Sequence, residues 1–363
     1  MLNYQITPTI NNISRNAIVF AINNAYAQYC AAAIQSLAEH TSRETFYDII
    51  IFEADISERN KRLLDSMIPE NFSLRFFDVS SVIYDFLGKN SLKTNGYVSV
   101  ETYYRLLIPI IMREYERVLY LDADICIVDN FHDLFSLTIG SNQIAGVIDA
   151  ISQMLAHYPK TYKHFREDLN LKNPEHYFNA GLVLFNIGSI DKDDYIEKLK
   201  DALKIRKLDY NDQDILNVIF QGKTYLYSSK FNTQTGALPL IDKITDQNFK
   251  DEYLVAIKNP TILHFTGERK PWDDPHKVFS EIFWQYERKT PFYEECLLSS
   301  VNKNYVSQTQ LKNVNSRFSI YFRYLFYKLL NKCSSGKTKE KFEKRYLKYK
   351  AKILDIQKYS TYK

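Results

Sequence analysis

The chain has 363 residues, of which 45% are hydrophobic and 25% charged, and its net charge is +4. This composition is ordinary for a folded globular protein and excludes collagen-like, low-complexity and fully disordered chains. No stretch reaches the roughly 18–20 apolar residues that a membrane span needs. The 4 cysteines lack CxxC spacing, which favours a reducing compartment over a disulfide framework. The N-terminus lacks a basic segment followed by an apolar run, so we predict no signal peptide and a cytoplasmic location.

The first third of the chain alternates between two kinds of pattern. Apolar runs predict strands at Ala17–Ala21, Asp48–Glu53 and Ser73–Val79. Helices are predicted between them, at Ala27–His40 and Ser57–Ser66. Strands alternating with helices at this spacing predict βαβ units, a mostly parallel sheet and an α/β fold.

The pattern continues through the middle of the chain. A helix over Ser99–Ile111 leads into a strand at Val118–Asp122, and another strand, Ile144–Ile148, ends at Asp149. The stretch Ile151–Phe178 is polar and aromatic without clear periodicity, which is typical of a lid or substrate loop. The elements expected after it are a strand following Asn179, a helix over Asp193–Lys207, a helix opened by Asp212 and a strand over Thr261–Phe265.

The segment VLYLDADICIVD, residues 118–129, is the most informative motif. An apolar run here predicts a strand buried on both faces. The run is followed directly by Asp122 and Asp124, with the small Ala123 between them. Carboxylates at the end of such a strand lie where open α/β sheets bind ligands. Both can turn toward one divalent cation held by oxygen ligands. Pairs of Asp also cap helices and solvate turns, so this motif alone leaves both interpretations open.

Charge is distributed unevenly. Residues 301–363 contain 16 Lys and Arg against 3 Asp and Glu, a net +13, so residues 1–300 carry −9. We therefore expect a domain over 1–300 and a basic tail over 301–363. The end of the tail repeats apolar side chains at the spacing of one helix face: Phe342, Tyr346, Tyr349, Ile353 and Ile356.

An amphipathic helix of this kind binds anionic membrane surfaces. The same stripe would also serve a coiled coil or a helix packed on a core, and this alternative stays open. The apolar run Phe318–Leu330 is too short, at 13 residues, to span a bilayer.

Six blocks in one order resemble the retaining glycosyltransferases of family 8, which include bacterial lipopolysaccharide galactosyl- and glucosyltransferases and glycogenin. The resemblance covers about residues 17–275. Its blocks are FAINNAYAQY, SVETYYRL, LYLDADICIVD, YFNAGLVLFN, NDQDILN and HFTGERKPW. The family implies the GT-A fold, a Rossmann-like mixed and mostly parallel sheet flanked by helices.

The resemblance implies a cation site. Asp122, Asp124 and His264 would hold Mn²⁺, with Mg²⁺ a weaker possibility because Mg²⁺ prefers all-oxygen ligand shells. Gly267 would let a phosphate approach backbone N–H groups, and Lys270 would supply charge to the leaving diphosphate. The alternatives are a core histidine for His264 and a solvated lysine for Lys270.

The resemblance also implies a pocket for the nucleotide. Ala21, Asn23 and Tyr26 would cradle a uracil, with Tyr26 stacked on the base. Asn23 departs from the Asp of many family members, but its carbonyl can still accept a hydrogen bond from the base. Arg105 would reach the sugar and phosphates. The alternatives are a helix cap for Asn23 and a surface ion pair with Glu101 for Arg105.

Further residues would contact the donor sugar. The resemblance places Ala123, Asn179, Ala180 and Gly181 among the substrate-binding residues, and Asp149, Asp212 and Gln213 among the catalytic ones. Capping is the alternative role for Asp149 and Asp212, and a turn is the alternative for Asn179. A carboxylate nucleophile is needed for two inversions. The family residue expected there aligns with Gln213, a poor nucleophile, which favours front-side attack.

The expected function is transfer of galactose or glucose from a UDP-sugar to a lipopolysaccharide core acceptor at the inner face of the cytoplasmic membrane. The alternative acceptor is a protein or soluble polyglucose, as for glycogenin. A lectin that keeps the fold would tolerate loss of the metal acids, which are present here. Nucleic-acid binding through the tail is not expected. Acceptor contacts are expected in Ile151–Phe178 and Asn232–Asp246.

Overall fold

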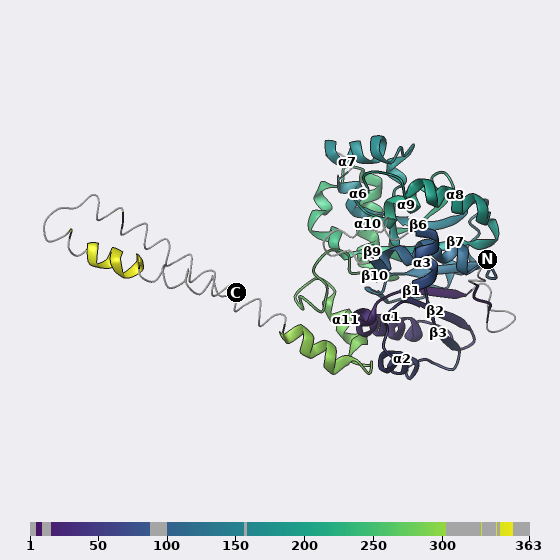
Figure 1. The fold of residues 1–363 in the computed structure, drawn as a ribbon, viewed down its shortest axis with the longest axis horizontal. Helices are drawn as coiled ribbons and strands as arrows, with labels where there is room; N and C mark the ends of the chain where they lie inside the picture. Colours follow the sequence, from purple (N-terminus) through teal and green to yellow (C-terminus); the bar gives the residue numbers. More distant parts are fainter. Residues whose placement is uncertain are drawn as a thin grey trace. The chain divides into compact units, whose positions relative to one another are not determined.

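The computed structural model describes residues 5–8, 16–87, 100–155, 158–302, 328, 339 and 342–350 (Figure 1). The chain divides into two units, Met1–Leu297 and Leu298–Lys363. The described cysteines, Cys30, Cys126 and Cys296, are buried and form no disulfide. Cys333 lies outside the described residues.

A seven-stranded sheet forms the centre of the first unit, in the order β3-β2-β1-β4-β7-β6-β8 (Figure 1). Neighbouring strands are parallel except at β7, which is antiparallel to both β4 and β6. The sheet is therefore mixed and mostly parallel, as predicted. In sheet order the strands are Phe72–Asp78, Tyr47–Glu53, Ala17–Ala21, Arg117–Leu121, Phe178–Asn186, Ile144–Ile148 and Thr224–Tyr227.

A second sheet of three short strands has the order β5-β10-β9. Its strands are Ile125–Ile127, Ile262–His264 and Thr233–Gln234. β10 is antiparallel to β5 and parallel to β9. Because β5 follows β4 after a three-residue connection, the two sheets meet at Asp122-Ala123-Asp124, here called the DAD motif.

Helices cover both faces of the large sheet. Ala17 and Val19 of β1 belong to one buried apolar cluster, and the alternating Ile18 and Phe20 belong to another. The α-helices α1 to α11 span Ala27–Glu39, Glu58–Asp65, Ser80–Leu87, Ile108–Ile111, Asp133–Ser136, Ala150–Leu155, Pro159–Lys163, Lys192–Ala202, Asp212–Ile219, Gln247–Lys258 and Ser280–Glu287. The other helical turns, η1 to η7, span Asn24–Tyr26, Val100–Leu107, His164–Asp168, Pro174–His176, Ile187–Ser189, Ser229–Asn232 and Thr235–Lys243.

The predicted elements over residues 17–79 are confirmed, with shifts of at most one residue at their ends. The single helix expected over Ser99–Ile111 is wrong in kind, because Val100–Leu107 is a 3₁₀-helix and the α-helix begins only at Ile108. Pro109 accounts for the break, since its ring would clash with the carbonyl of Arg105 in a continuous α-helix.

The expectation of an irregular loop over Ile151–Phe178 is also wrong. This stretch contains α6, α7, a π-helix at His164–Asp168 and a 3₁₀ turn at Pro174–His176. These helices have only three to six residues, too few for helical periodicity to show in the sequence. Asn179 lies inside β7 rather than before it, and α8 ends at Ala202 rather than at Lys207.

In the second unit, residues 342–350 are helical, as predicted. Phe342, Tyr346 and Tyr349 are partly buried, whereas the lysines at 344, 348 and 350 are exposed. The structure does not describe Ile353 or Ile356. Of the run Phe318–Leu330 it describes Lys328 alone. Across the described part of the chain, no helix has both the length and the apolar character needed to cross a bilayer.

Candidate active site

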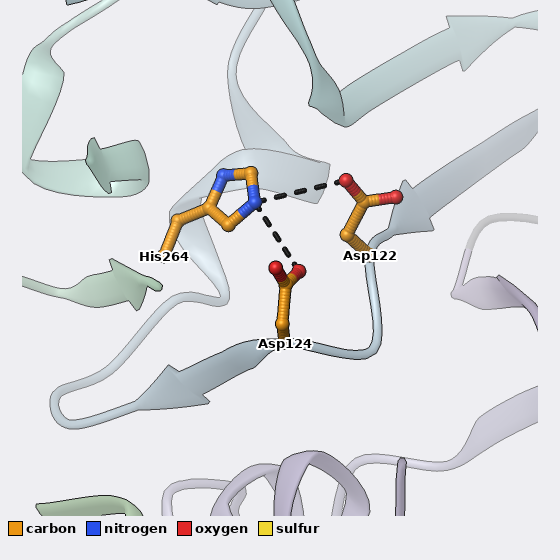
Figure 2. Close-up of side chains that lie close together, drawn as sticks. All are labelled: Asp122, Asp124 and His264. Atoms are coloured by element: carbon orange, nitrogen blue, oxygen red, sulfur yellow. Dashed lines mark ion pairs between the residues drawn. The ribbon is translucent and has the colours of Figure 1, made fainter. Parts of the chain in front are cut away.

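The DAD motif connects the two sheets (Figure 2). β4 ends at Leu121, the chain passes through Asp122 and Asp124, and β5 begins at Ile125. The backbone N–H of Asp122 donates to the carbonyl of Gly181 at 2.9 Å, and that of Phe265 donates to the carbonyl of Asp124 at 2.9 Å. Both carboxylates are thus anchored by backbone bonds to β7 and to the end of β10.

His264 ends β10 and pairs with Ile125 of β5, which brings its ring beside both acids (Figure 2). Its Nε2 lies 3.6 Å from Asp122 Oδ2 and 3.3 Å from Asp124 Oδ1. Ligand atoms of these three residues all lie within 4.8 Å of one another. Two carboxylate oxygens and an imidazole nitrogen form a donor set suited to a divalent transition metal, so the residues fit the cation that the sequence predicts.

Lys270 contacts one of the two acids, Asp124. Its Nζ donates to Asp124 Oδ2 and, at 2.9 Å, to the carbonyl of Phe265. Burial by itself raises the pKa of Asp124, but Lys270 and His264 outweigh it and hold that pKa well below its usual range. Lys270 is therefore not a solvated lysine, and Asp124 stays ionised at neutral pH.

Arg105 is buried, and each nitrogen of its guanidinium group contacts an oxygen atom of the protein. Its Nη2 lies 2.9 Å from Asp122 Oδ1, and its Nε lies 3.0 Å from Asp212 Oδ2. Nη1 donates to the carbonyl of Ala180 at 2.5 Å. The surface ion pair with Glu101 left open above is wrong. Instead, Arg105 holds a DAD carboxylate and the first residue of α9 at fixed positions.

Asp212 lies in an unusual electrostatic environment. Burial is the largest effect and raises its pKa to about 6, although Arg105 and a hydrogen bond from Thr102 Oγ1 at 2.7 Å favour the carboxylate. The preceding Asn211 has φ 48° and ψ −116°, a strained conformation for a non-glycine residue, and its Oδ1 is buried without a partner. Strain of this kind is typical of functional turns.

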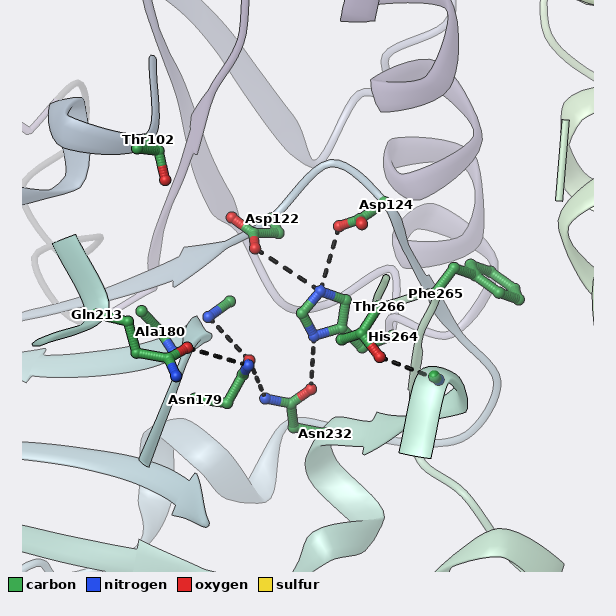
Figure 3. Close-up of polar contacts among 12 residues, drawn as sticks. Thr102, Asp122, Asp124, Asn179, Ala180, Gln213, Asn232, His264, Phe265 and Thr266 are labelled. Carbon is green, nitrogen blue, oxygen red and sulfur yellow. Dashed lines mark hydrogen bonds and ion pairs between the residues drawn. The ribbon is translucent and has the colours of Figure 1, made fainter. Parts of the chain in front are cut away.

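Three predicted sugar-contact residues, Asp149, Asn179 and Gln213, form one network. Figure 3 shows the contact of Asn179 and Gln213. Gln213 Oε1 accepts from Asn179 Nδ2 at 3.2 Å and from the Ala180 backbone N–H at 3.0 Å. Asp149 Oδ2 accepts from Asn179 Nδ2 at 2.9 Å and from Gln213 Nε2 at 3.3 Å. The other oxygen of Asp149 accepts from the backbone N–H of Ser152 at 2.7 Å, so Asp149 also caps α6.

A cavity of about 190 Å³ opens at the DAD motif. Most of the predicted nucleotide and metal residues line this cavity, namely Ala21, Asn23, Tyr26, Arg105, Asp122, Ala123, Asp124 and Lys270. Glu101, Thr102 and Tyr120 line it as well. Asn23 also caps η1, because its Oδ1 accepts from the Tyr26 backbone N–H at 3.1 Å. Gly267 has φ 91°, which favours glycine, and open space where a side chain would start.

A larger cavity of about 370 Å³ is lined by Lys172, His176, Asn217 and other residues near the start of β7. It contains none of the predicted metal or nucleotide residues, so we assign the site to the smaller cavity. Sequence reasoning missed Thr102 and Tyr120, and it placed Asn232 in a stretch expected to contact the acceptor rather than beside His264. Tyr120 Oη bonds Asp122 Oδ1 at 2.7 Å, yet no motif separates it from the other core residues of β4.

The model of glycosyl transferase family 8 matches residues 17–275. The chain belongs to this family. It is a glycosyltransferase, and the family predicted from the six blocks is confirmed.

The relatives agree with this assignment. The lipopolysaccharide 1,3-galactosyltransferase of Salmonella typhimurium is 29% identical over 245 residues, 63% of this chain and 68% of that protein. General stress protein A of Bacillus subtilis is 24% identical over 268 residues, 72% of this chain and 88% of that protein. The galactosyltransferase LgtC, solved with donor and acceptor sugar analogues, is 26% identical, with a TM-score of 0.60 over 76% of this chain and 96% of that chain. The predicted GT-A fold is thereby confirmed.

Proposed function

We propose that this glycosyltransferase moves galactose or glucose, with retention, from a UDP-sugar to a lipopolysaccharide core or related glycolipid acceptor. The single observation that carries the proposal is the convergence of Asp122, Asp124 and His264 at the edge of the cavity lined by Tyr26. The acceptor class rests on similarity to the lipopolysaccharide galactosyltransferase of Salmonella typhimurium.

The cation proposed for this site is Mn²⁺. Its donor set would be one oxygen from each of Asp122 and Asp124 and Nε2 of His264. When bound, such an ion supplies Lewis-acid neutralisation of the diphosphate that leaves. Lys270, already in contact with Asp124, is proposed to contribute a positive charge near the same phosphate oxygens.

The residues beyond the cation site are proposed to hold the donor sugar. Asp149, Asn179 and Gln213 present short carboxylate and amide groups that suit sugar hydroxyls. Gln213 is a poor nucleophile and both of its amide atoms are hydrogen-bonded to neighbours. Asp212 is held by Arg105 and Thr102. These contacts favour front-side attack, with the leaving phosphate oxygen taking the acceptor's proton and Gln213 stabilising positive charge at the anomeric carbon.

The tail supports a membrane location for this reaction. We propose that residues 1–300 form the transferase domain and that residues 301–363 bind the anionic cytoplasmic face of the membrane. The +13 charge and the partly buried aromatic stripe over 342–350 support this assignment. Attachment there would raise the local concentration of a lipid-linked acceptor.

The decisive experiment measures UDP release from a panel of UDP-sugars, with and without Mn²⁺, in the full-length protein and in the Asp124→Asn variant. We expect release from UDP-galactose or UDP-glucose that needs Mn²⁺ and is lost in the variant while the fold persists. Full activity in EDTA, or undiminished activity of Asp124→Asn, would contradict the cation site. Faster transfer to a protein or polyglucose than to a lipopolysaccharide core would contradict the proposed acceptor.

A further inference from the structure

A chain of buried amides runs from the cation site to the proposed sugar site (Figure 3). His264 Nδ1 lies 2.9 Å from Asn232 Oδ1, on the side of the ring away from the acids. Asn232 Nδ2 lies 3.0 Å from Asn179 Oδ1. Asn179 in turn reaches Asp149 and Gln213. His264, Asn232 and Asn179 are 3%, 1% and 8% exposed, so water has little access to this chain.

Asp149 and the backbone of Gly181, at the sugar-site end of this row of hydrogen bonds, determine which group donates in each bond. The Asp149 carboxylate only accepts, so the side of Asn179 that faces it must be the NH₂ group. The backbone N–H of Gly181 only donates, and at 3.0 Å it fixes Asn179 Oδ1 on the opposite side. Flipping the Asn179 amide would place its oxygen against the carboxylate of Asp149 and its NH₂ group against the backbone N–H of Gly181.

The orientation of the Asn179 amide determines that of Asn232, and Asn232 in turn determines the tautomer of His264. Because Asn179 presents its oxygen, Asn232 must present its NH₂ group to Asn179 and its oxygen to His264. The imidazole therefore carries its proton on Nδ1. A neutral ring then has its lone pair on Nε2, the nitrogen that faces Asp122 and Asp124.

We propose that Asn232 is a positioning residue that holds His264 as the Nδ1–H tautomer, ready to bind a divalent cation through Nε2. Metal-binding histidines generally donate their second ring N–H to an acceptor that fixes tautomer and ring orientation. The fold keeps Asn232 in place, since it ends η6 directly before β9, and β9 pairs with β10, which carries His264. Through Asn179, the same amide links the cation site to Gln213.

Two variants separate the two ends of the Asn232 side chain. Asn232→Leu has nearly the same size but cannot accept from His264 or donate to Asn179. Asn232→Asp still accepts from His264 Nδ1–H but cannot donate to Asn179. Thr233→Val is the matched control, because Thr233 is the next buried residue and its hydroxyl donates to the carbonyl of Ser229, at 3.1 Å, within the same turn.

Mn²⁺ is titrated into each full-length protein with saturating UDP, and free Mn²⁺ is followed by electron paramagnetic resonance. We expect the Kd for Mn²⁺ to rise ~10- to 100-fold in Asn232→Leu and to stay unchanged in Thr233→Val. Asn232→Asp should keep the wild-type Kd and lose kcat. The inference is overturned if folded Asn232→Leu binds Mn²⁺ as the wild type does, if Thr233→Val weakens binding equally, or if Asn232→Asp keeps full kcat.

A second measurement uses the unaltered protein and does not depend on a variant folding. In ¹⁵N spectra of the histidine-labelled protein, the His264 signal should show a protonated Nδ1. An unprotonated Nδ1 beside a protonated Nε2 would overturn the inference. The inference rests on the proposed cation-dependent transfer, and the readouts separate the two: a wild-type protein that binds no Mn²⁺ refutes the proposed function, whereas equal binding by Asn232→Leu refutes only the role of Asn232.

Discussion

At the scale of single residues, Gly181 shows how closely the cation site is packed. A Cβ at this position would overlap His264 Cε1 and lie 2.7 Å from Asp122 Oδ2. Glycine is thus the residue that lets β7 pass directly behind both proposed ligands. Since a well-packed site has no room for an added methyl group, the ligands would have to move.

We predict that Gly181→Ala costs about 1–3 kcal/mol of stability by overpacking and weakens Mn²⁺ binding, while the sheet still forms. Calorimetric titration of Mn²⁺ together with chemical denaturation would measure both effects. Gly188→Ala is the matched control, because a Cβ there meets nothing within 4 Å and the variant should bind Mn²⁺ normally. Equal Mn²⁺ affinity in Gly181→Ala and the wild type would show that His264 and Asp122 do not share an ion.

Tyr26 is the residue on which selection of the base is expected to depend. It lines the cavity, is 37% exposed, and is held edge-on against Tyr29 and Trp272 at centroid distances of 5.4 and 6.2 Å. Stacking of a base on an aromatic ring contributes ~1–3 kcal/mol. Because the base does not react, this binding is shared by ground state and transition state.

We therefore predict that Tyr26→Ala raises the KM for the UDP-sugar roughly 5- to 150-fold, the ratio that corresponds to this stacking energy, and changes kcat less. Steady-state kinetics with saturating Mn²⁺ would measure the split. Tyr26→Phe keeps the ring and should behave like the wild type. Similar calorimetric affinities for UDP and GDP in the unaltered protein would argue against a uracil pocket here.

At the scale of elements, the π-helix His164–Asp168 is joined to the start of α9. His164 Nε2 lies 3.0 Å from Asp214 Oδ2, and its Nδ1 lies 3.1 Å from Asp168 Oδ2. Asp214 also accepts from Tyr177 Oη at 2.5 Å. The contact attaches the segment before β7 to the turn that carries Asp212 and Gln213.

This contact predicts a pH-dependent stability. Burial lowers the pKa of His164, but Asp214, Asp168 and Asp209 raise it more, so the pKa lies above its usual value. The charged ring therefore stabilises the fold fully below the unfolded pKa of about 6.5, and this contribution is lost as pH rises through the higher folded pKa.

We predict that His164→Gln costs about 1–3 kcal/mol at pH 6, because Asp214 loses a charged partner, and less at pH 9. Urea denaturation at the two pH values would measure the difference. His176→Gln, an exposed histidine in the neighbouring 3₁₀ turn, should leave the pH dependence unchanged. Equal costs of His164→Gln at pH 6 and pH 9 would mean that the ring is not charged in the folded protein.

At the scale of the whole molecule, the chain separates at Leu297–Leu298 into two units of opposite charge character. We predict that a protein ending near residue 300 folds, releases UDP from its donor and no longer sediments with anionic liposomes. Each Lys or Arg near such a surface contributes about 1 kcal/mol of binding, so the loss should be near complete.

Liposomes of neutral lipid are the control for this experiment, and neither protein should bind them. Sedimentation at physiological salt and at high salt would test the electrostatic origin of binding. If the shortened protein fails to fold, or the full-length protein ignores anionic liposomes, the tail packs on a core or another subunit instead.

Much of the fold was predictable from local patterns. The strands β1 to β4 and the helices α1 and α2 follow from buried apolar runs and amphipathic spacing, because these elements are long enough to show their period. The short helices between Ala150 and His176 were not predictable, since their formation depends on tertiary contacts such as that between His164 and Asp214.

The sequence by itself determined the family, the α/β fold class and the proposed cation ligands, because Asp122, Asp124 and His264 lie in motifs that can be read along the chain. Only the tertiary structure decided what surrounds them. Arg105 turns inward to Asp122 and Asp212, and Asn232 meets His264, because β9 and β10 are neighbours in space while about 30 residues separate them in the chain. A hydrogen bond between distant residues leaves no local pattern in a sequence, so the partners of the site's residues became visible only once the chain had folded.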